Sequence, residues 1–103
     1  MDPGTTGIVG GVSEAKPATP EIQEVADKVK RQLEEKTNEK YEKFKVVEYK
    51  SQVVAGQILF MKVDVGNGRF LHMKVLRGLS GDDDLKLLDY QTNKTKNDEL
   101  TDF

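Results

Sequence analysis

The hydrophobic residues of this chain recur with two different periods, and the change between them lies near residue 40. Before that point they are three or four positions apart, which places them on one face of a helix. After it, apolar and polar residues alternate over several short stretches, which is typical of strands with one buried face. Because 103 residues provide only one modest core, the helix and the strands must bury their apolar faces against each other.

The predicted helix has both a start signal and an end signal. Thr19 is a good N-cap, Pro20 suits the first helical position, and Glu21 favours the positive end of the helix dipole. The helical pattern fades near Thr37 and Asn38. The apolar stripe consists of Ile22, Val25, Ala26, Val29 and Leu33. This stripe needs a complementary apolar surface, which the strands supply.

The strand region contains a change of phase near its start. Apolar residues follow one alternation up to Val46 and the opposite one from Val47, which indicates a β-bulge. Farther on, Gly66-Asn67-Gly68 predicts a tight hairpin turn between two alternating stretches. A polar turn at 79–84 precedes a last short strand from Leu85 to Tyr90. We therefore expect an α+β domain, with a single helix packed across an antiparallel sheet of four to five strands.

Both ends of the chain differ in character from this central region. Residues 1–18 contain four glycines and two prolines and no large anchoring side chain, so we expect this segment to be mobile. We divide the chain into a flexible N-terminal arm at 1–11 and a folded domain at 12–103. The C-terminal tail is polar and should run along the surface, held there by Leu100 and Phe103.

Charge and composition exclude several classes of protein. The net charge is −2 and no basic block stands out, so the electrostatic surface expected of a nucleic-acid-binding protein is missing. The absence of cysteine excludes disulfides and thiolate chemistry. No apolar run approaches the roughly 20 residues that a membrane-spanning helix needs, and the N-terminus does not read as a secretory signal. We therefore expect a cytoplasmic protein that binds neither nucleic acid nor membrane.

The sequence also offers little catalytic chemistry. His72 is the only histidine, and it alternates with apolar neighbours in a strand, so we expect it to face away from them in a structural or solvent-exposed position. Asp82-Asp83-Asp84 lacks the alternating ligands and closing glutamate of a calcium loop, and we interpret it as a solvated turn. We expect no enzymatic activity, no metal and no cofactor.

Three segments carry apolar or flexible residues that the core does not need. They are Ile8-Val9-Gly10-Gly11, Gln52-Val53-Val54-Ala55-Gly56 and Leu79-Ser80-Gly81. Alternate turns of an antiparallel meander emerge at the same end of the sheet, so the turns at 52–56 and 79–84 should lie together. An N-terminal arm beside them would complete a narrow apolar edge suited to a cleft, although spacing alone favours ordinary turns.

These segments, in this order, resemble the cystatin superfamily and its stefin branch. The resemblance is carried by GGVSEAKPATPEI at 10–22, by QVVAG at 52–56, by a Leu-X-Gly turn at 79–81 and by DELTDF at 98–103, and it covers residues 10–103. It is supported by the lack of cysteines, which the stefin branch shares. This chain departs from the stefin pattern in two places. Proline is common where Ser80 stands, and the arm before Gly10 is long for a stefin.

The resemblance implies a reversible, competitive, tight-binding inhibitor that acts as a wedge in the active-site cleft of papain-like cysteine proteases of the cathepsin B, H, L and S type. Gly10 would be the reactive-site glycine, and glycines at 10 and 56 would let the backbone approach the enzyme closely. The residues implied to contact the protease are Ile8, Val9, Gly10, Gly11, Gln52, Val53, Val54, Ala55, Gly56, Leu79, Ser80 and Gly81.

A second hypothesis comes from a different class of protein. Stefins resemble a precursor of cornified-envelope material, and the lysine- and glutamine-rich surface of this chain would suit crosslinking. A hairpin with valines in its loop could also open and exchange strands with a second copy. The alternative is therefore a structural or assembly protein. We expect a monomer, with a strand-exchanged dimer as the other state.

Overall fold

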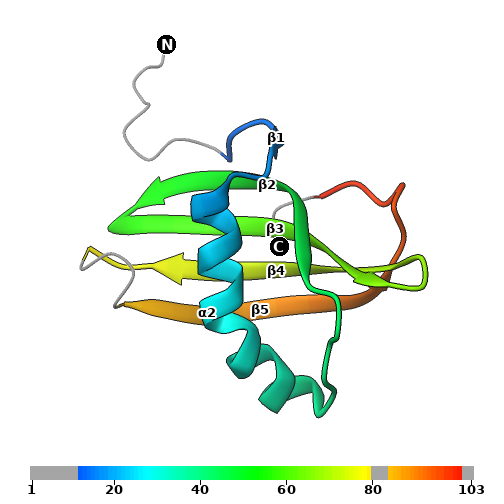
Figure 1. Ribbon diagram of the computed structural model, residues 1–103. Helices are drawn as coiled ribbons and strands as arrows, with labels where there is room; N and C mark the ends of the chain where they lie inside the picture. The colour runs from blue at the N-terminus through cyan, green and yellow to red at the C-terminus, as the bar shows by residue number, and fades with distance from the viewer. Residues whose placement is uncertain (1–11, 80–83, 101–103) are drawn as a thin grey trace.

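The computed structural model describes residues 12–79 and 84–100. A long helix lies diagonally across one face of an antiparallel sheet whose five strands follow one another in chain order (Figure 1). The predicted α+β class and the single layer of helix on sheet are thereby confirmed. The elements are β1 (Lys16–Pro17), α2 (Pro20–Thr37), β2 (Lys45–Val54), β3 (Gly56–Gly66), β4 (Arg69–Arg77) and β5 (Leu85–Lys94).

Helix α2 begins and ends where its local signals predict. The Thr19 hydroxyl accepts a hydrogen bond from the Ile22 amide at 3.2 Å, and Pro20 is the first helical residue. At the other end Asn38 adopts a left-handed conformation (φ 59°), and its amide donates to the Glu34 carbonyl at 2.8 Å. All five residues of the predicted stripe are buried. The stripe is thus confirmed as the helical half of the core.

The sheet supplies the other half of the core from alternate positions of its strands. Around the predicted phase change, Val46 pairs with Val63 and Glu48 with Lys62, so Val47 is the extra residue of a bulge. Val47 consequently points outward and is 43% exposed. The buried strand residues that pack under the helix are Val46, Leu59, Met61, Val63, Leu71, Met73, Val75 and Leu87.

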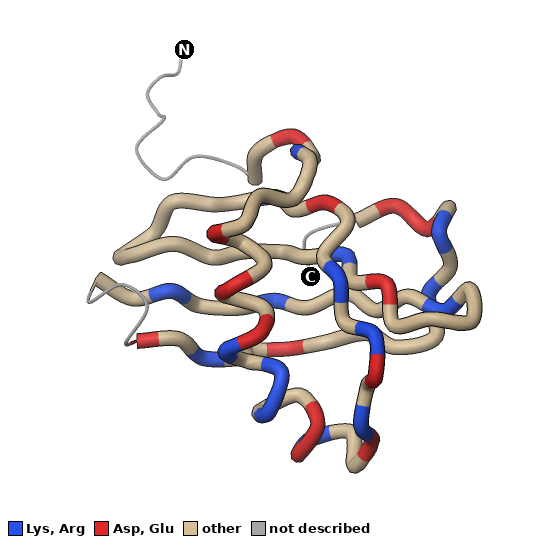
Figure 2. The backbone as a smooth tube through the Cα atoms, in the orientation of Figure 1, with Lys and Arg blue, Asp and Glu red and all other residues tan. Residues whose placement is uncertain are grey.

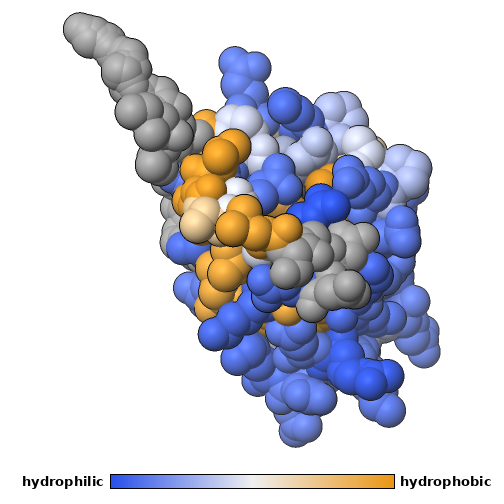
Figure 3. All heavy atoms as spheres, turned by 90° about the vertical axis from the view of Figure 1, so that its left-hand side faces the viewer, coloured by the Kyte–Doolittle hydropathy of each residue, from blue (hydrophilic) through white to orange (hydrophobic). Residues whose placement is uncertain are grey.

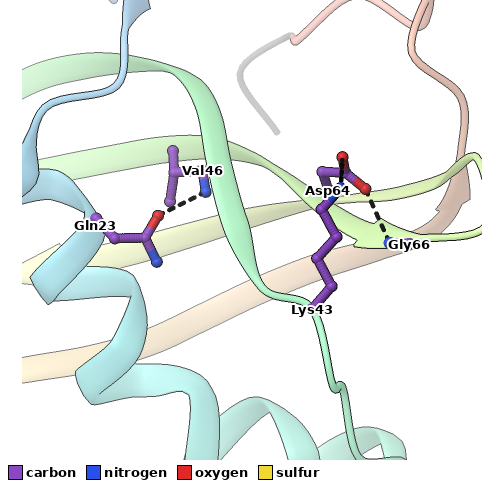
Figure 4. Close-up of polar contacts among 5 residues, drawn as sticks. All are labelled: Gln23, Lys43, Val46, Asp64 and Gly66. Carbon is purple, nitrogen blue, oxygen red and sulfur yellow. Dashed lines mark hydrogen bonds and ion pairs between the residues drawn. The ribbon is translucent and has the colours of Figure 1, made fainter.

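Two glutamines on α2 bind backbone groups of the sheet. The Gln23 side chain accepts from the Val46 amide at 2.9 Å (Figure 4) and also donates to the Phe44 carbonyl at 2.9 Å. Gln32 accepts from the Leu87 amide at 3.0 Å. Neither role is predictable from the sequence, because the helical pattern gives only the place of the two glutamines outside the apolar stripe. Each amide satisfies polar backbone groups that would otherwise lie unpaired next to the core.

The turn at 66–68 has the conformation that its glycines and asparagine predict. Asn67 and Gly68 have φ of 58° and 73°, as a two-residue turn between right-twisted strands requires. The Asp64 carboxylate accepts from the Gly66 amide at 2.8 Å and lies 3.0 Å from the Lys43 ammonium (Figure 4). The Gly66 amide and the Lys43 charge hold the pKa of Asp64 below its ordinary value. The predicted hairpin is confirmed.

The expectation of a mobile segment through residue 18 is wrong for residues 12–18. Lys16 pairs with Tyr49 and Pro17 with Glu48, so this short strand covers the outer edge of β2. Ser13 adds two further bonds, because its amide donates to the Ser51 carbonyl at 2.7 Å and its hydroxyl accepts from the Ser51 amide at 3.0 Å. An uncovered strand edge offers a row of donors and acceptors, and a polar segment needs no apolar anchor to bind there. The boundary between an arm at 1–11 and a folded domain stays a prediction.

The C-terminal part also contains more strand than expected. Strand β5 continues past the predicted end at Tyr90, and Phe70 still pairs with Lys94 after a register shift. Asn93 adopts φ of 58°, a conformation that asparagine tolerates and that accommodates the irregularity. The predicted anchoring by Leu100 is confirmed, since this side chain is buried. Phe103 lies outside the described residues.

His72 faces the side of the sheet opposite the helix, as expected, and its position is structural. The side chain is fully buried, and neither ring nitrogen has a hydrogen-bond partner within the described part of the chain. Its strand neighbour Lys62 is also buried and donates to the Lys96 carbonyl at 3.1 Å. Burial, followed by the nearby Lys62 charge, lowers the pKa of His72 to about 4.

This burial predicts a specific loss of stability in mild acid. As pH falls below about 6.5, the unfolded protein takes up a proton at His72 before the folded protein does, so the free energy of unfolding decreases until about pH 4. The loss should be about 3 kcal/mol in total. Urea unfolding of the wild type and of His72→Leu at pH 7, 5.5 and 4 measures it.

The His72→Leu variant provides the matched reference, because all other titratable groups are unchanged and the chain has no second histidine. At pH 7 it should be at least as stable as the wild type, since it removes from the interior a polar ring that has no hydrogen-bond partner among the described residues. Parallel stability curves for the two proteins from pH 7 to 4 would show that His72 is not responsible.

Candidate functional site

One end of the sheet contains both turns singled out in the sequence. Val54 pairs with Gly56, Gln57 with Arg77, and Arg77 in turn with Leu85. The end of β2, the start of β3, the end of β4 and the start of β5 therefore lie side by side, on the left of Figure 1. The prediction that these two turns share an end of the sheet is confirmed. We call this part of the molecule, comprising residues 52–58, 77–79 and 84–85, the sheet tip.

The first turn of the sheet tip is tighter than the five-residue loop that the sequence suggested. Gln52, Val53 and Val54 belong to β2, and Gly56 already begins β3, so Ala55 alone connects the two strands. Val53 is nevertheless 61% exposed, because its strand projects beyond the rest of the protein. Pairing on both sides of Ala55 leaves this turn little freedom to change shape.

Gly56 lies against the second turn. Its φ of 103° is accessible mainly to glycine. A β-carbon at this position would lie 2.5 Å from the Arg77 carbonyl oxygen and 3.1 Å from the Gly78 α-carbon. The backbone of Gly56 therefore already lies close to another backbone segment of this chain, at Arg77 and Gly78. The expectation that this glycine also admits the backbone of an enzyme stays a prediction.

The second turn leaves the sheet at Gly78 and rejoins it at Asp84. The Gly78 amide donates to the Asp84 carbonyl at 2.8 Å, which closes the base of the turn. Leu79 follows this bond and is 86% exposed. The preceding residue, Arg77, forms an ion pair of 3.0 Å with Glu21 in the first turn of α2. Ser80 and Gly81 lie outside the described residues.

The N-terminal segment reaches the sheet next to the first turn. Ser13 is bonded to Ser51, which directly precedes Gln52. The described chain therefore begins beside the sheet tip, where an N-terminal arm was predicted to join it. Besides Ser80 and Gly81, four more residues predicted to contact a protease lie outside the described residues, namely Ile8, Val9, Gly10 and Gly11.

Apolar side chains gather at the sheet tip, and its two charged residues, Arg77 and Asp84, lie at the base of the second turn. Seen end-on, the hydrophobic atoms form one cluster surrounded by hydrophilic residues (Figure 3). The hairpin of β2 and β3 carries no charged residue from Gln52 to Ile58, whereas charges are dense on α2 and at its C-terminal end (Figure 2). Two large hydrophobic residues, Val53 and Leu79, are the most exposed of their kind among the described residues.

The chemistry of the sheet tip is that of a contact surface. No residue from 52 to 58 carries an acid, a base or a nucleophile suited to catalysis. Among residues 12–79 and 84–100, no three histidine, cysteine or acidic side chains come together as metal ligands would. The uncharged, paired turn at 52–58, with the exposed Leu79 beside it, is suited to insertion into an apolar cleft. Within the same ranges, no helix is both long and apolar enough to span a bilayer.

Known proteins with similar sequences cover nearly the whole chain. Residues 10–97 match the cystatin domain. The chain is 79% identical to Stefin-3 of Mus musculus over 94 residues, which is 91% of each chain. It is 65% identical to Cystatin-A of Mus musculus over 96 residues, covering 93% of this chain and 99% of the relative.

A third relative has a name that states an activity. The chain is 56% identical over 97 residues to Leukocyte cysteine proteinase inhibitor 1 of Sus scrofa, covering 93% of this chain and 94% of the relative. The domain match and the high identity extend across the helix, the sheet and the sheet tip together. This chain belongs to the cystatin family, and stefins are among its relatives.

Proposed function

We propose that this protein is a reversible, competitive inhibitor of papain-like cysteine proteases of the cathepsin B, H, L and S type. The observation that carries the proposal is the exposure of Val53 and Leu79 at the sheet tip, next to an uncharged first turn, in a chain of the cystatin family. The name of the relative from Sus scrofa supports the same class of target. In this proposal the protein is not an enzyme and forms no covalent bond with its target.

The proposed contact consists of three segments that enter the active-site cleft together. The first turn, residues 52–56, would lie against the region of the catalytic cysteine, and the second turn, residues 79–81, on the primed side. Ile8 and Val9, followed by the reactive-site Gly10 and by Gly11, would occupy the non-primed subsites. Preformed turns lose little conformational entropy on binding, so a modest contact area of roughly 800 Å² per partner would suffice for tight binding.

The tight first turn also explains how an inhibitor could resist cleavage. A protease needs an extended, accessible peptide segment on both sides of the bond that it cuts. Here the backbone on both sides of Ala55 is paired in the β2–β3 ladder, because Val54 pairs with Gly56 and Val53 with Gln57. The valines therefore offer apolar contact area without presenting an aligned peptide bond.

A cytoplasmic location and a monomeric state stay predictions.

Titration of active papain or a cathepsin L-type enzyme tests the proposal directly. We expect enzyme activity to fall stoichiometrically with added protein, and the protein to be recovered uncut after dissociation. The measurement is residual hydrolysis of a fluorogenic peptide, followed by mass spectrometry of the recovered inhibitor. Unchanged activity at a large molar excess of the protein would contradict the proposed function.

A charge placed on the sheet tip should weaken binding. We expect Val53→Asp to raise the inhibition constant about 10- to 100-fold, because a carboxylate would be buried in an apolar contact without a partner. The residue is already exposed, so the fold should tolerate the change. Val47→Asp is the matched control, since Val47 is an exposed valine of the same strand at its opposite end. Equal effects of the two substitutions would rule out the sheet tip as the contact surface.

Removal of residues 1–10 tests the contribution of the N-terminal arm. We expect the truncated protein to bind more weakly because it dissociates faster, since the apolar contacts of the arm are lost. The fold should be kept, because the bonds of Ser13 to Ser51 and the pairing of β1 remain. Stopped-flow kinetics and circular dichroism measure the two quantities. An unchanged dissociation rate would remove the arm from the mechanism.

A further inference from the structure

At the sheet tip, residues of neighbouring strands still lie opposite one another beyond the last regular β3–β4 pair. Val54 pairs with Gly56, and Gly78 donates to the Asp84 carbonyl at 2.8 Å. The last pair of β3 with β4 is Gln57 with Arg77, so Gly56 and Gly78 face each other one step farther out. The first turn and the second turn thus meet at two glycines.

The contact between these glycines is backbone against backbone. A β-carbon on Gly56 would lie 2.5 Å from the Arg77 carbonyl oxygen and within 3.2 Å of two backbone atoms of Gly78. Neither partner is the end of a flexible side chain that could rotate away. A methyl group at Gly56 would therefore force the two turns apart, because a close-packed contact of this kind has no free volume.

Glycines at the opposite end of the sheet show that the positive φ alone does not create this constraint. Gly66 has φ of 92°, close to the 103° of Gly56. A β-carbon on Gly66 would meet nothing nearer than 3.8 Å, and one on Gly68 would meet nothing within 4 Å. A similar positive φ thus occurs with open space at one end of the sheet and with a neighbouring turn at the other.

The neighbours of Gly78 extend the constraint to the exposed leucine. On its other side Gly78 is held by the hydrogen bond of 2.8 Å that its amide donates to the Asp84 carbonyl. Leu79 is the next residue and is exposed, so its direction depends on where Gly78 is held. The contact of Gly56 with Arg77 and Gly78 on one side, and of Gly78 with Asp84 on the other, holds it.

We propose that Gly56 is a positioning residue that aligns Gly78 and Leu79, where the second turn begins, relative to the first turn. This inference rests on the proposed function, because alignment matters for binding only if both turns enter one cleft. Gly56 acts here through Arg77 and Gly78 and need not touch the protease itself. Its role differs from that of the valines, which provide apolar area.

The contact itself is tested in the wild-type protein without any protease. We expect a strong nuclear Overhauser effect between the α-protons of Gly56 and Gly78, and slow hydrogen exchange of the Gly78 amide, which is bonded to Asp84. Absence of this Overhauser effect in the folded protein would overturn the inference, whatever the protein inhibits.

The variant Gly56→Ala, compared with Gly66→Ala, tests the consequence for binding. Both substitutions place alanine at a similar positive φ, and only the first meets a neighbouring turn. We expect Gly56→Ala to shift the amide resonances of Arg77, Gly78 and Leu79 and to weaken inhibition of papain about tenfold or more, chiefly through the dissociation rate. Gly66→Ala should bind like the wild type. Equal inhibition by the two folded variants would overturn the inference.

A double-mutant cycle with Leu79→Ala separates positioning from direct contact. If Gly56 acts by aligning the second turn, removal of the Leu79 side chain should cost less in the Gly56→Ala background than in the wild type. Additive losses would show that Gly56 acts only at the first turn. If the wild type does not inhibit papain at all, the proposed function fails, while the resonance shifts still report on the contact between the turns.

Discussion

The packing of α2 on one face of the sheet is the contact on which the rest of this structure depends. The helix offers a stripe of five buried residues, and the strands supply alternating valines, leucines and methionines that fill the space beneath it. A chain of this length can form only one such core, so loss of this contact would leave neither the helix nor the sheet stable. The helix covers only the middle of the sheet, because the strands are longer than the helix is wide. The sheet tip therefore extends beyond the covered area (Figure 1).

Polar side chains bind the backbone donors and acceptors at the sheet edges that the apolar core leaves without partners. Gln23 and Gln32 bind backbone groups of β2 and of the outer strand β5, and Ser13 and β1 cover the outer edge of β2 nearer the sheet tip. A bare strand edge invites pairing with another chain, so these contacts also protect the edge from association. The bonds of Ser13 and the pairing of β1 also bring the N-terminal segment next to the first turn. Edge protection and the assembly of the proposed binding surface therefore share the same hydrogen bonds.

The sheet tip combines apolar exposure with rigidity. Val53 and Leu79 project into solvent, which costs free energy in the isolated protein, and their backbones are held by ladder pairing and by the contact of Gly56 with Gly78. A flexible loop carrying the same valine and leucine would have to be ordered on binding, and that entropy would oppose association. Rigidity here comes from glycines, because only residues without side chains allow two turns to approach so closely.

The sequence by itself determined the elements of this protein and the order in which they occur. The two hydrophobic periods, the cap at Thr19 and the turn at 66–68 are local features, and each is set by residues only a few positions apart. From them the helix, the antiparallel meander and the shared end of two turns could be predicted. The resemblance to the cystatin family, carried by short motifs, added the identity of the proposed contact residues.

Only the tertiary structure decided how polar and small residues are used. The strand at Lys16–Pro17, the amide contacts of Gln23 and Gln32, and the burial of His72 all depend on groups that lie far away in the chain. The role of Gly56 is of the same kind, since its neighbour Gly78 is brought close by strand pairing. Hydrophobic periodicity shows which face of an element is buried. It does not show which distant backbone group lacks a partner or where two chain segments touch, because those depend on how the elements pack.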